Sequence, residues 1–353
     1  MNLQRRLSYA FLLVWCCFVQ HVSCAKLMKE VPYKLKNLCS DINAPVLQGR
    51  QKAKILSWLL EATSESSLKL KSSPQHRAAC WMLFGDPNRK SVQGSRVVFR
   101  QRYALAVFYY ATEGPKHWYP DVGNPNATTS AYKADGSHPW LSKFHECTWY
   151  GVKCSGTIIP FTFRPVVGLD ISFFGVAGIL PRELALLSNM KEIDLHGNDL
   201  QGVLPHMAVV NWKKLEYMRL HMNGLFGNLH KEMKEMKNLK QLILFGNYFA
   251  GTIPKELSQL KKLEVIDLYA NQLEGRIPSE LAALPKLRKL DLHDNNLIGV
   301  MPKEICERKL PVLIADCLGA KPEVRCDCCT VCCHGLPRMI CKDVKTGETV
   351  IPS

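Results

Sequence analysis

The chain has 353 residues, of which 47% are hydrophobic and 22% charged, and its formal net charge is +15 at pH 7. This length and balance exclude a disordered or fibrous chain and allow a well-buried core with more than one structural unit. The surplus of Lys and Arg lies mainly in residues 25–165. It fits an anionic polysaccharide, an acidic partner or an anionic surface better than nucleic acid, although a merely solubilising surface explains it equally well.

Residues 1–24 have the pattern of a secretory signal peptide. Arg5 and Arg6 precede an apolar stretch from Leu7 to Val19, and small residues lead to Cys24. The stretch is shorter than the roughly 20 apolar residues that cross a bilayer, so a signal anchor is the weaker interpretation and no membrane span is expected. We predict a secreted, extracellular chain whose remaining cysteines, even in number, form disulfides.

Residues 25–94 are predicted to form a helical N-terminal extension. Residues 48–62 and 74–84 have helical spacing, and Ser73 is placed to cap the second segment, which starts with a proline. Cys39 and Cys80 flank these segments and are candidates for a disulfide. No chemistry is recognisable in this extension.

Residues 95–165 are predicted to form an N-terminal cap. Residues 102–110 have the pattern of a helix, and a long loop follows it. Within this loop the sequon Asn126-Ala127-Thr128 lies among Gly, Pro, Asn, Ser and Thr residues, where an acceptor would be exposed. Asn126 is therefore a candidate glycosylation site, which would make the chain a glycoprotein.

Residues 166–310 repeat one pattern about every 24 residues, in six copies that begin at Val166, Met190, Leu215, Leu239, Leu263 and Leu287. Apolar residues at the first, fourth and sixth positions predict a short strand with one buried face, and the copies are expected to stack as parallel rungs. The ninth position is Asn198, Asn223, Asn247, Asn271 and Asn295 in the last five copies. A column of buried amides would satisfy the backbone where the chain leaves each strand. A Gly and usually a Pro follow, permitting a bend and starting the return.

This pattern resembles the plant-type leucine-rich repeat, whose signature ends in Asn-x-Leu-x-Gly-x-Ile-Pro. The resemblance implies an α/β fold, a curved solenoid with its parallel sheet on the concave side. Phe174 replaces the first Asn, which suggests an edge rung packed against a cap, and His230 replaces the third Pro, which suggests a locally altered convex wall.

The cap before the repeats resembles the N-terminal cap of plant-type repeat proteins. That resemblance implies a disulfide between Cys147 and Cys154, with Trp118, Trp140 and Trp149 in the core of the cap rather than in a ligand platform.

Residues 311–353 are predicted to form a Cys-rich C-terminal cap. Together with Cys306 this segment supplies eight cysteines, too many to assign their pairing. A zinc site is one interpretation, but export and the absence of regular Cys-x-x-Cys pairs favour a disulfide knot, so no metal is predicted. The tail and the front helices resemble exported repeat proteins of diatoms and related algae, which implies architecture more than function.

The candidate binding residues are at the fifth and seventh positions of each strand, which point away from the buried leucines. They are Asp194, His196, Arg219, His221, Phe245, Asp267, Tyr269, Asp291 and His293. Aromatic rings beside charged groups are typical of binding surfaces, although a solvated sheet face remains the alternative. Six rungs span roughly 24 Å, enough for about seven extended peptide residues.

Two of these residues raise further hypotheses. His196 and His221 could hold a metal with Asp194, but two imidazoles without a fixed third ligand are usually surface residues. Their protonation near pH 6.5 is instead predicted to tune affinity.

The sequence contains no nucleophile elbow, phosphate-binding glycine loop or His-Glu-x-x-His motif, so we expect no enzyme and no cofactor. The preferred hypothesis is a receptor-like recognition protein that binds an extracellular protein, peptide or glycan on its concave face. The alternative is a structural matrix or cell-wall protein held to anionic polymer by its basic N-terminal region.

Overall fold

The computed structural model describes residues 38–39, 49–88, 92, 94–118, 137–156, 164–319, 322–334 and 340–350. The chain forms two compact units, residues 1–84 and 85–353. The predicted signal peptide (1–24) and the candidate glycosylation site Asn126 lie outside the described residues. Within the described ranges, no helix is long and apolar enough to cross a membrane.

The first unit is helical, as the spacing of its apolar residues predicts. Its helices are α3 (Gly49–Ala62), α4 (Glu65–Lys69) and α5 (Pro74–Cys80), and a π-helical turn η4 (Trp81–Gly85) continues α5. Ser73 caps α5, because its Oγ accepts a hydrogen bond of 3.0 Å from the backbone N–H of His76. A disulfide joins Cys39 to Cys80.

The second unit begins with a cap of one long helix and a small aromatic core. The cap contains α7 (Arg96–Ala111), α8 (Gly114–His117), the 3₁₀ turn η5 (Glu146–Thr148) and β1 (Val152–Cys154). Trp118, Trp140 and Trp149 are at most 3% exposed and pack against one another, with ring centroids 5.0 to 5.4 Å apart between successive pairs. Cys147 is bonded to Cys154. The tryptophans therefore belong to the cap core, as the resemblance implies.

A fully buried arginine holds this cap together. Arg102 on α7 makes paired hydrogen bonds of 2.8 and 3.0 Å to the carboxylate of Asp86, and its Nη1 lies 3.0 Å from Glu146 Oε2. Its guanidinium also lies 4.5 Å from the ring centroid of Trp149. Two carboxylates and an aromatic face thus compensate one buried cation, which would be costly if any partner were lost.

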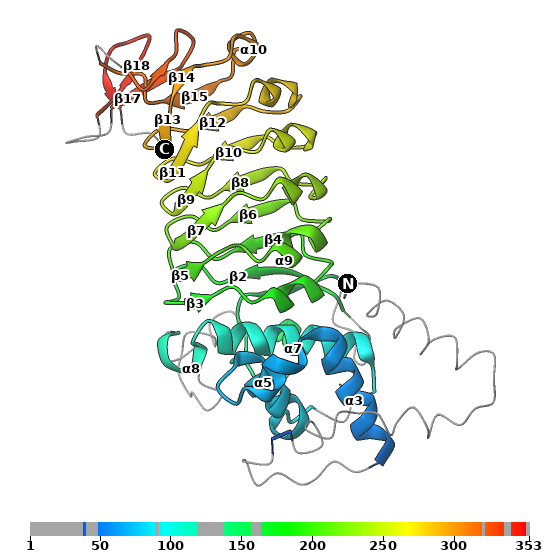
Figure 1. Cartoon of the computed structure of the whole chain (residues 1–353). Helices are drawn as coiled ribbons and strands as arrows, with labels where there is room; N and C mark the ends of the chain where they lie inside the picture. The colour runs from blue at the N-terminus through cyan, green and yellow to red at the C-terminus, as the bar shows by residue number, and fades with distance from the viewer. Residues whose placement is uncertain are drawn as a thin grey trace, which may run out of the picture. The chain divides into compact units, whose positions relative to one another are not determined.

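After the cap, each repeat copy adds one rung to two parallel sheets, and the rungs rise in order in Figure 1. The parallel rung strands of the main sheet are β2 (Val166–Asp170), β4 (Glu192–Asp194), β6 (Tyr217–Arg219), β8 (Gln241–Ile243), β10 (Val265–Asp267), β12 (Lys289–Asp291) and β15 (Val312–Ala315). Strand β1 of the cap pairs antiparallel with β2 at the edge of this sheet. The strands of the second sheet are β3 (Ala177–Ile179), β5 (Asp199–Gly202), β7 (Gly224–Asn228), β9 (Tyr248–Gly251), β11 (Gln272–Gly275) and β13 (Asn296–Leu297).

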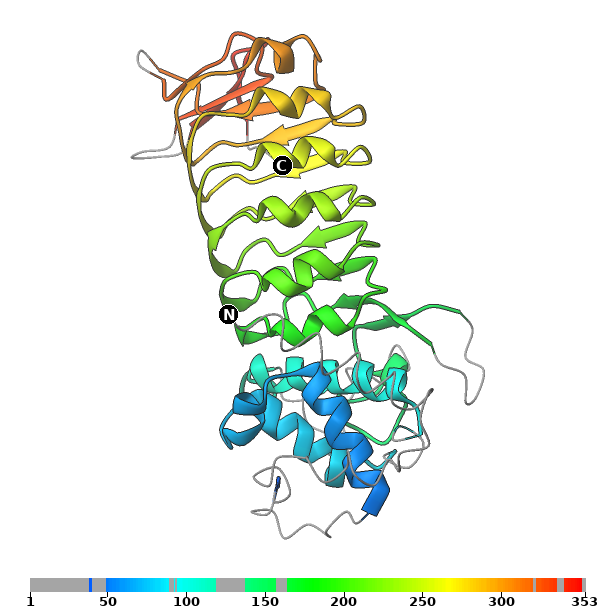
Figure 2. The same cartoon turned by 45° about the vertical axis from the view of Figure 1, so that its right-hand side comes forward.

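Short helical turns return the chain from one rung to the next, and Figure 2 shows them stacked on the side opposite the main sheet. They are η6 (Arg182–Leu186), α9 (His206–Asn211), η7 (Lys231–Glu235), η8 (Lys255–Gln259), η9 (Ser279–Ala283) and α10 (Lys303–Cys306). The parallel register places equivalent apolar residues side by side, as in Leu242, Ile266 and Leu290, which are all fully buried. This leucine column is the core predicted from the repeat.

The asparagines at the ninth position bond across rungs as predicted. Asn271 Oδ1 accepts a 2.9 Å hydrogen bond from the N–H of Phe249, and its Nδ2 donates to the carbonyls of Leu244 and Leu268 at 3.1 and 3.0 Å. Each such amide therefore completes the turn of the preceding rung and of its own.

The two departures from the repeat have the expected local effects. Phe174, which replaces the first Asn, packs against Tyr150 of the cap with ring centroids 4.4 Å apart, and its N–H donates to Asn198 Oδ1 at 3.0 Å. His230, which replaces a Pro before η7, forms a 2.9 Å hydrogen bond through Nε2 to the carbonyl of Leu204.

The C-terminal cap continues the main sheet with β17 (Val331–His334), β18 (Ile340–Asp343) and β19 (Thr349–Val350), while β14 (Gly299–Val300) pairs with β16 (Val324–Arg325). Its eight cysteines form four disulfides: Cys306–Cys328, Cys317–Cys332, Cys326–Cys329 and Cys333–Cys341. Every cysteine of the conceivable zinc cluster is thereby bonded to another cysteine, which favours the disulfide interpretation.

Candidate functional site

The seventh-position residues of successive strands form a continuous stack of rings on the face of the main sheet that points away from the leucine core. This ring stack comprises His196, His221, Phe245, Tyr269 and His293, whose neighbouring centroids lie 4.3 to 4.7 Å apart with interplanar angles of 8° to 31°. The spacing matches the distance between rungs, about 4.8 Å. Because neighbouring rings cover one another's faces, the stack presents mainly ring edges to solvent.

One more ring ends the stack on the N-terminal side. Phe173 meets His196 edge to face, with centroids 4.8 Å apart and ring planes at 83°, and it is 58% exposed. The sequence pattern did not single it out, because only the fifth and seventh positions were predicted to face a ligand and Phe173 occupies the eighth. The sequence does contain a sign of its exposure: Phe173 is a bulky apolar residue at a position where the next rung has Gly197.

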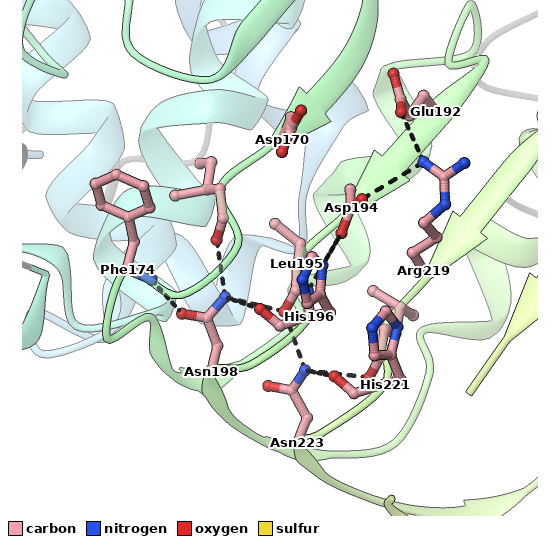
Figure 3. A network of polar contacts seen from close by, with 12 residues as sticks. Asp170, Phe174, Glu192, Asp194, Leu195, His196, Asn198, Arg219, His221 and Asn223 are labelled. Atoms are coloured by element: carbon pink, nitrogen blue, oxygen red, sulfur yellow. Dashed lines mark hydrogen bonds and ion pairs between the residues drawn. The ribbon is translucent and has the colours of Figure 1, made fainter. Parts of the chain in front are cut away.

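Charged side chains flank the ring stack at its N-terminal half, as Figure 3 shows. Arg219 Nη1 lies 3.0 Å from Glu192 Oε1 and 3.5 Å from Asp194 Oδ2, and its Nη2 donates to Gln241 at 2.9 Å. Asp194 Oδ1 in turn lies 2.5 Å from His196 Nδ1. The carboxylate thus fixes both the guanidinium and the imidazole, so these side chains are preorganised.

The same ion network extends toward the cap through Glu192, which also pairs with Arg219. Lys153 of β1 bridges Asp170 and Glu192, with both N–O distances 2.9 Å. The carboxylates and the hydrogen bonds raise the pKa of Lys153 against the opposing effect of burial, which is the largest single influence. The fifth-position column is therefore internally paired, and it offers a ligand few uncompensated charges.

Burial changes the proton affinities of the stack. It lowers the pKa of His221 to about 4, with the neighbouring His196 and Arg219 adding to the effect. His221 Nδ1 has no hydrogen-bond partner among the described residues, which fits a neutral ring. Near neutral and mildly acid pH His221 is consequently uncharged, and this disagrees with the prediction that it titrates near pH 6.5. Burial also raises the pKa of Tyr269 to about 12.

At the C-terminal half, the acidic residues are buried rather than displayed. Asp267 and Asp291 are 4% and 0% exposed, and Lys289 Nζ lies 3.0 Å from Asp267 Oδ2 and 3.9 Å from Asp291 Oδ2. Burial, followed by the charge of Asp291, raises the pKa of Asp267 to about 6. These two carboxylates form an internal ion cluster with Lys289 and do not face a ligand.

At the C-terminal end of the ring stack, the structure does not support His293 as a ligand-contacting residue. His293 is 0% exposed, its Nδ1 lies 2.6 Å from Asp291 Oδ1, and one of its ring nitrogens lies within 4.8 Å of both sulfurs of the Cys333–Cys341 disulfide. The C-terminal cap covers the last ring, so a ligand on this face of the sheet does not touch it. Of the nine predicted residues, the partly exposed ones are His196, Arg219, His221, Phe245 and Tyr269.

Sulfur and imidazole ligands cluster at three places in the described residues, but disulfides occupy them. The groups are Cys39, His76 and Cys80; His293, Cys333 and Cys341; and Cys317, Cys326 and Cys329. Since each of these cysteines is bonded to another cysteine, no thiolate is free to bind a metal ion there.

The leucine-rich-repeat family, described as "Leucine rich repeat", matches residues 237–297. With the six rungs, this match defines the class: the chain is an α/β leucine-rich-repeat solenoid. Its repeats are of the plant type, and two Arabidopsis thaliana proteins are similar to it. The LRR receptor-like serine/threonine-protein kinase GSO2 is 35% identical over 87 residues, and Leucine-rich repeat extensin-like protein 4 is 33% identical over 67 residues.

These matches are partial. They cover 25% and 19% of this chain, and only 6% and 13% of the two relatives. Among solved structures, the chain is similar to the LRR ectodomain of the Arabidopsis receptor kinase GASSHO1/SCHENGEN3 in complex with CASPARIAN STRIP INTEGRITY FACTOR 2, with a TM-score of 0.47, 29% identity, and coverage of 52% of this chain and 21% of the other. A plant ice-binding protein matches with a TM-score of 0.49, 22% identity, and coverage of 65% and 64%. The resemblance to exported algal proteins stays a prediction.

Proposed function

We propose that this chain is a secreted recognition protein that holds a short, extended peptide segment along the ring stack, without transforming it. One observation carries the proposal: partly exposed rings lie in register on adjacent rungs, beside an ion network that fixes their neighbours. Aromatic side chains contribute large contact area with few rotamers to immobilise, which is why they dominate binding surfaces.

The orientation of the rings favours a peptide over a glycan. Sugars bind aromatic side chains mainly through the ring faces, and in this stack neighbouring rings cover those faces. The partly exposed His196 and Tyr269 supply a ring nitrogen and a phenol oxygen, polar atoms that can pair with the alternating N–H and C=O groups of an extended backbone.

The open length of the stack sets the size of the ligand. His196 to Tyr269 covers four rungs, or roughly 14 Å, about four extended residues. This is shorter than the six rungs expected from the sequence, because the first rung has Ser172 in place of a ring and the C-terminal cap covers the last ring. A ligand held by the stack alone is therefore bound weakly, and tight binding requires contacts elsewhere.

The disulfides support the proposed location. The described residues contain six of them, distributed over both units. Such pairs form and persist in oxidising compartments, including the extracellular space.

The test is selection of a random octapeptide library on the oxidised protein, with heparin and polygalacturonate as polysaccharide probes. Phe245→Ala and Tyr269→Ala are each expected to weaken a selected peptide by about tenfold or more, because they remove contact area at the centre of the site. Tyr248→Ala is the matched control: Tyr248 is 56% exposed but belongs to β9 of the second sheet, and its loss should leave binding unchanged.

Two outcomes would overturn this function. If no peptide is selected and the protein binds only the polyanions, with salt-sensitive affinity that the ring substitutions leave unchanged, the chain is the matrix protein of the alternative hypothesis. If Tyr248→Ala weakens the peptide as much as Tyr269→Ala does, the ligand lies on another face.

A further inference from the structure

Two bulky apolar residues next to the ring stack occupy a backbone conformation that suits glycine. Phe173 and Met222, at the eighth position of the first and third rungs, both have φ of 55°. The same position in the second and fourth rungs is Gly197 and Gly246, with φ of 66° and 63°. Left-handed backbone is unfavourable for large side chains, so glycine on all four rungs would form the same turn at less cost.

These two side chains are also unusually exposed. Phe173 is 58% exposed and Met222 is 50% exposed, although each is among the larger apolar residues of the rungs. The chain thus accepts both backbone strain and exposed apolar surface at two alternate rungs beside the ring stack. Strain and exposed apolar surface at one place indicate a role other than folding.

The orientation of Phe173 shows what it offers. Its ring stands at 83° to His196, and it reaches over Gly197, where a Cβ would collide with it. Among the described residues no ring other than His196 contacts it. The other rings of the stack cover one another's faces, whereas the perpendicular Phe173 ring is not sandwiched between two rings of the described residues.

We propose that Phe173 and Met222 form an anchor for an aromatic side chain of the bound peptide, at the end of the ring stack nearest the N-terminal cap. An incoming ring packs on the face of Phe173, and a thioether such as that of Met222 makes favourable contacts with aromatic rings. The anchor is continuous with the stack through His196, and this inference rests on the proposed peptide-binding function.

The experiment compares peptide selection on the wild-type protein and on the double variant Phe173→Gly, Met222→Gly. Octapeptides selected by the wild type are expected to carry an aromatic residue at one end, and the double variant is expected to lose that preference and bind the same peptides about tenfold more weakly. Because glycine suits the left-handed turn, the midpoint temperature of unfolding should stay the same or rise. Ala270→Gly is the matched control, since Ala270 has φ of 53° at the same position of the fifth rung.

A further variant distinguishes the aromatic ring of Phe173 from its apolar bulk. Phe173→Leu retains an apolar side chain, and the peptides it selects should still lack the preference for an aromatic residue. If wild type and double variant select the same aromatic position, the anchor is refuted while the proposed function stands. If the wild type selects no peptide at all, both are refuted.

Discussion

Replacing Asp267 with Asn removes a buried carboxylate and should stabilise the protein at neutral pH. The side chain is 4% exposed, its Oδ1 has no hydrogen-bond partner among the described residues, and burial together with Asp291 raises its pKa from 3.8 to about 6. At about 1.4 kcal/mol per pKa unit, this rise corresponds to about 3 kcal/mol. The ion pair with Lys289 opposes the rise and does not cancel it.

The sign follows from proton linkage. The folded state holds this proton more tightly than the unfolded chain, so its contribution to stability is complete below about pH 4 and is lost as pH rises through about 6. Asp267→Asn is therefore expected to raise the free energy of unfolding at about pH 7 by up to about 3 kcal/mol and to have little effect near about pH 4.

Thermal unfolding of the oxidised protein at a series of pH values measures this difference. Asp199→Asn, at an exposed position on β5, is the control and should leave the unfolding temperature unchanged throughout. A variant that is less stable than wild type at neutral pH would refute the reasoning, because the Lys289 ion pair would then outweigh the burial of the carboxylate.

Two further predictions follow from buried groups. Arg102→Met leaves the carboxylates of Asp86 and Glu146 buried without their cation. We expect the free energy of unfolding, measured by thermal unfolding, to fall by about 3 to 5 kcal/mol. A decrease below about 1 kcal/mol would contradict the stabilising role of this buried triad. His221, whose pKa burial lowers to about 4, should keep the NMR signature of a neutral imidazole from about pH 7 down to about pH 5; a midpoint near 6.5 would instead restore the pH-tuning hypothesis for this residue.

The periodic part of the structure was predictable because its contacts recur with the repeat. Asn271 bonds to Phe249 and Leu268, and equivalent contacts are made by the asparagines of the second to sixth rungs. Residue spacing alone therefore located the strands, the asparagine column and the ring stack. Such local periodicity reports which face a residue occupies.

Contacts made once were not predictable in this way. Arg102 meets Asp86 and Glu146 from 16 and 44 residues away, with no periodic signal linking them. The burial of His293 depends on the pairing of Cys333 with Cys341, one among many connectivities that eight cysteines allow. The sequence therefore located the ring stack but not where the C-terminal cap closes it.

The direction of the asparagine bonds has a consequence for biosynthesis. The amide of Asn247 accepts a hydrogen bond from Leu225, on the rung made before it. A growing chain therefore cannot complete one turn until the ribosome has produced the next rung. After the sixth rung no Asn follows, and Asp316 of the C-terminal cap accepts the N–H groups of Asp294 and Asn295 at 3.0 and 3.4 Å. The last turn is thus completed only after Asp316 of the C-terminal cap has left the ribosome, later than the six rungs themselves.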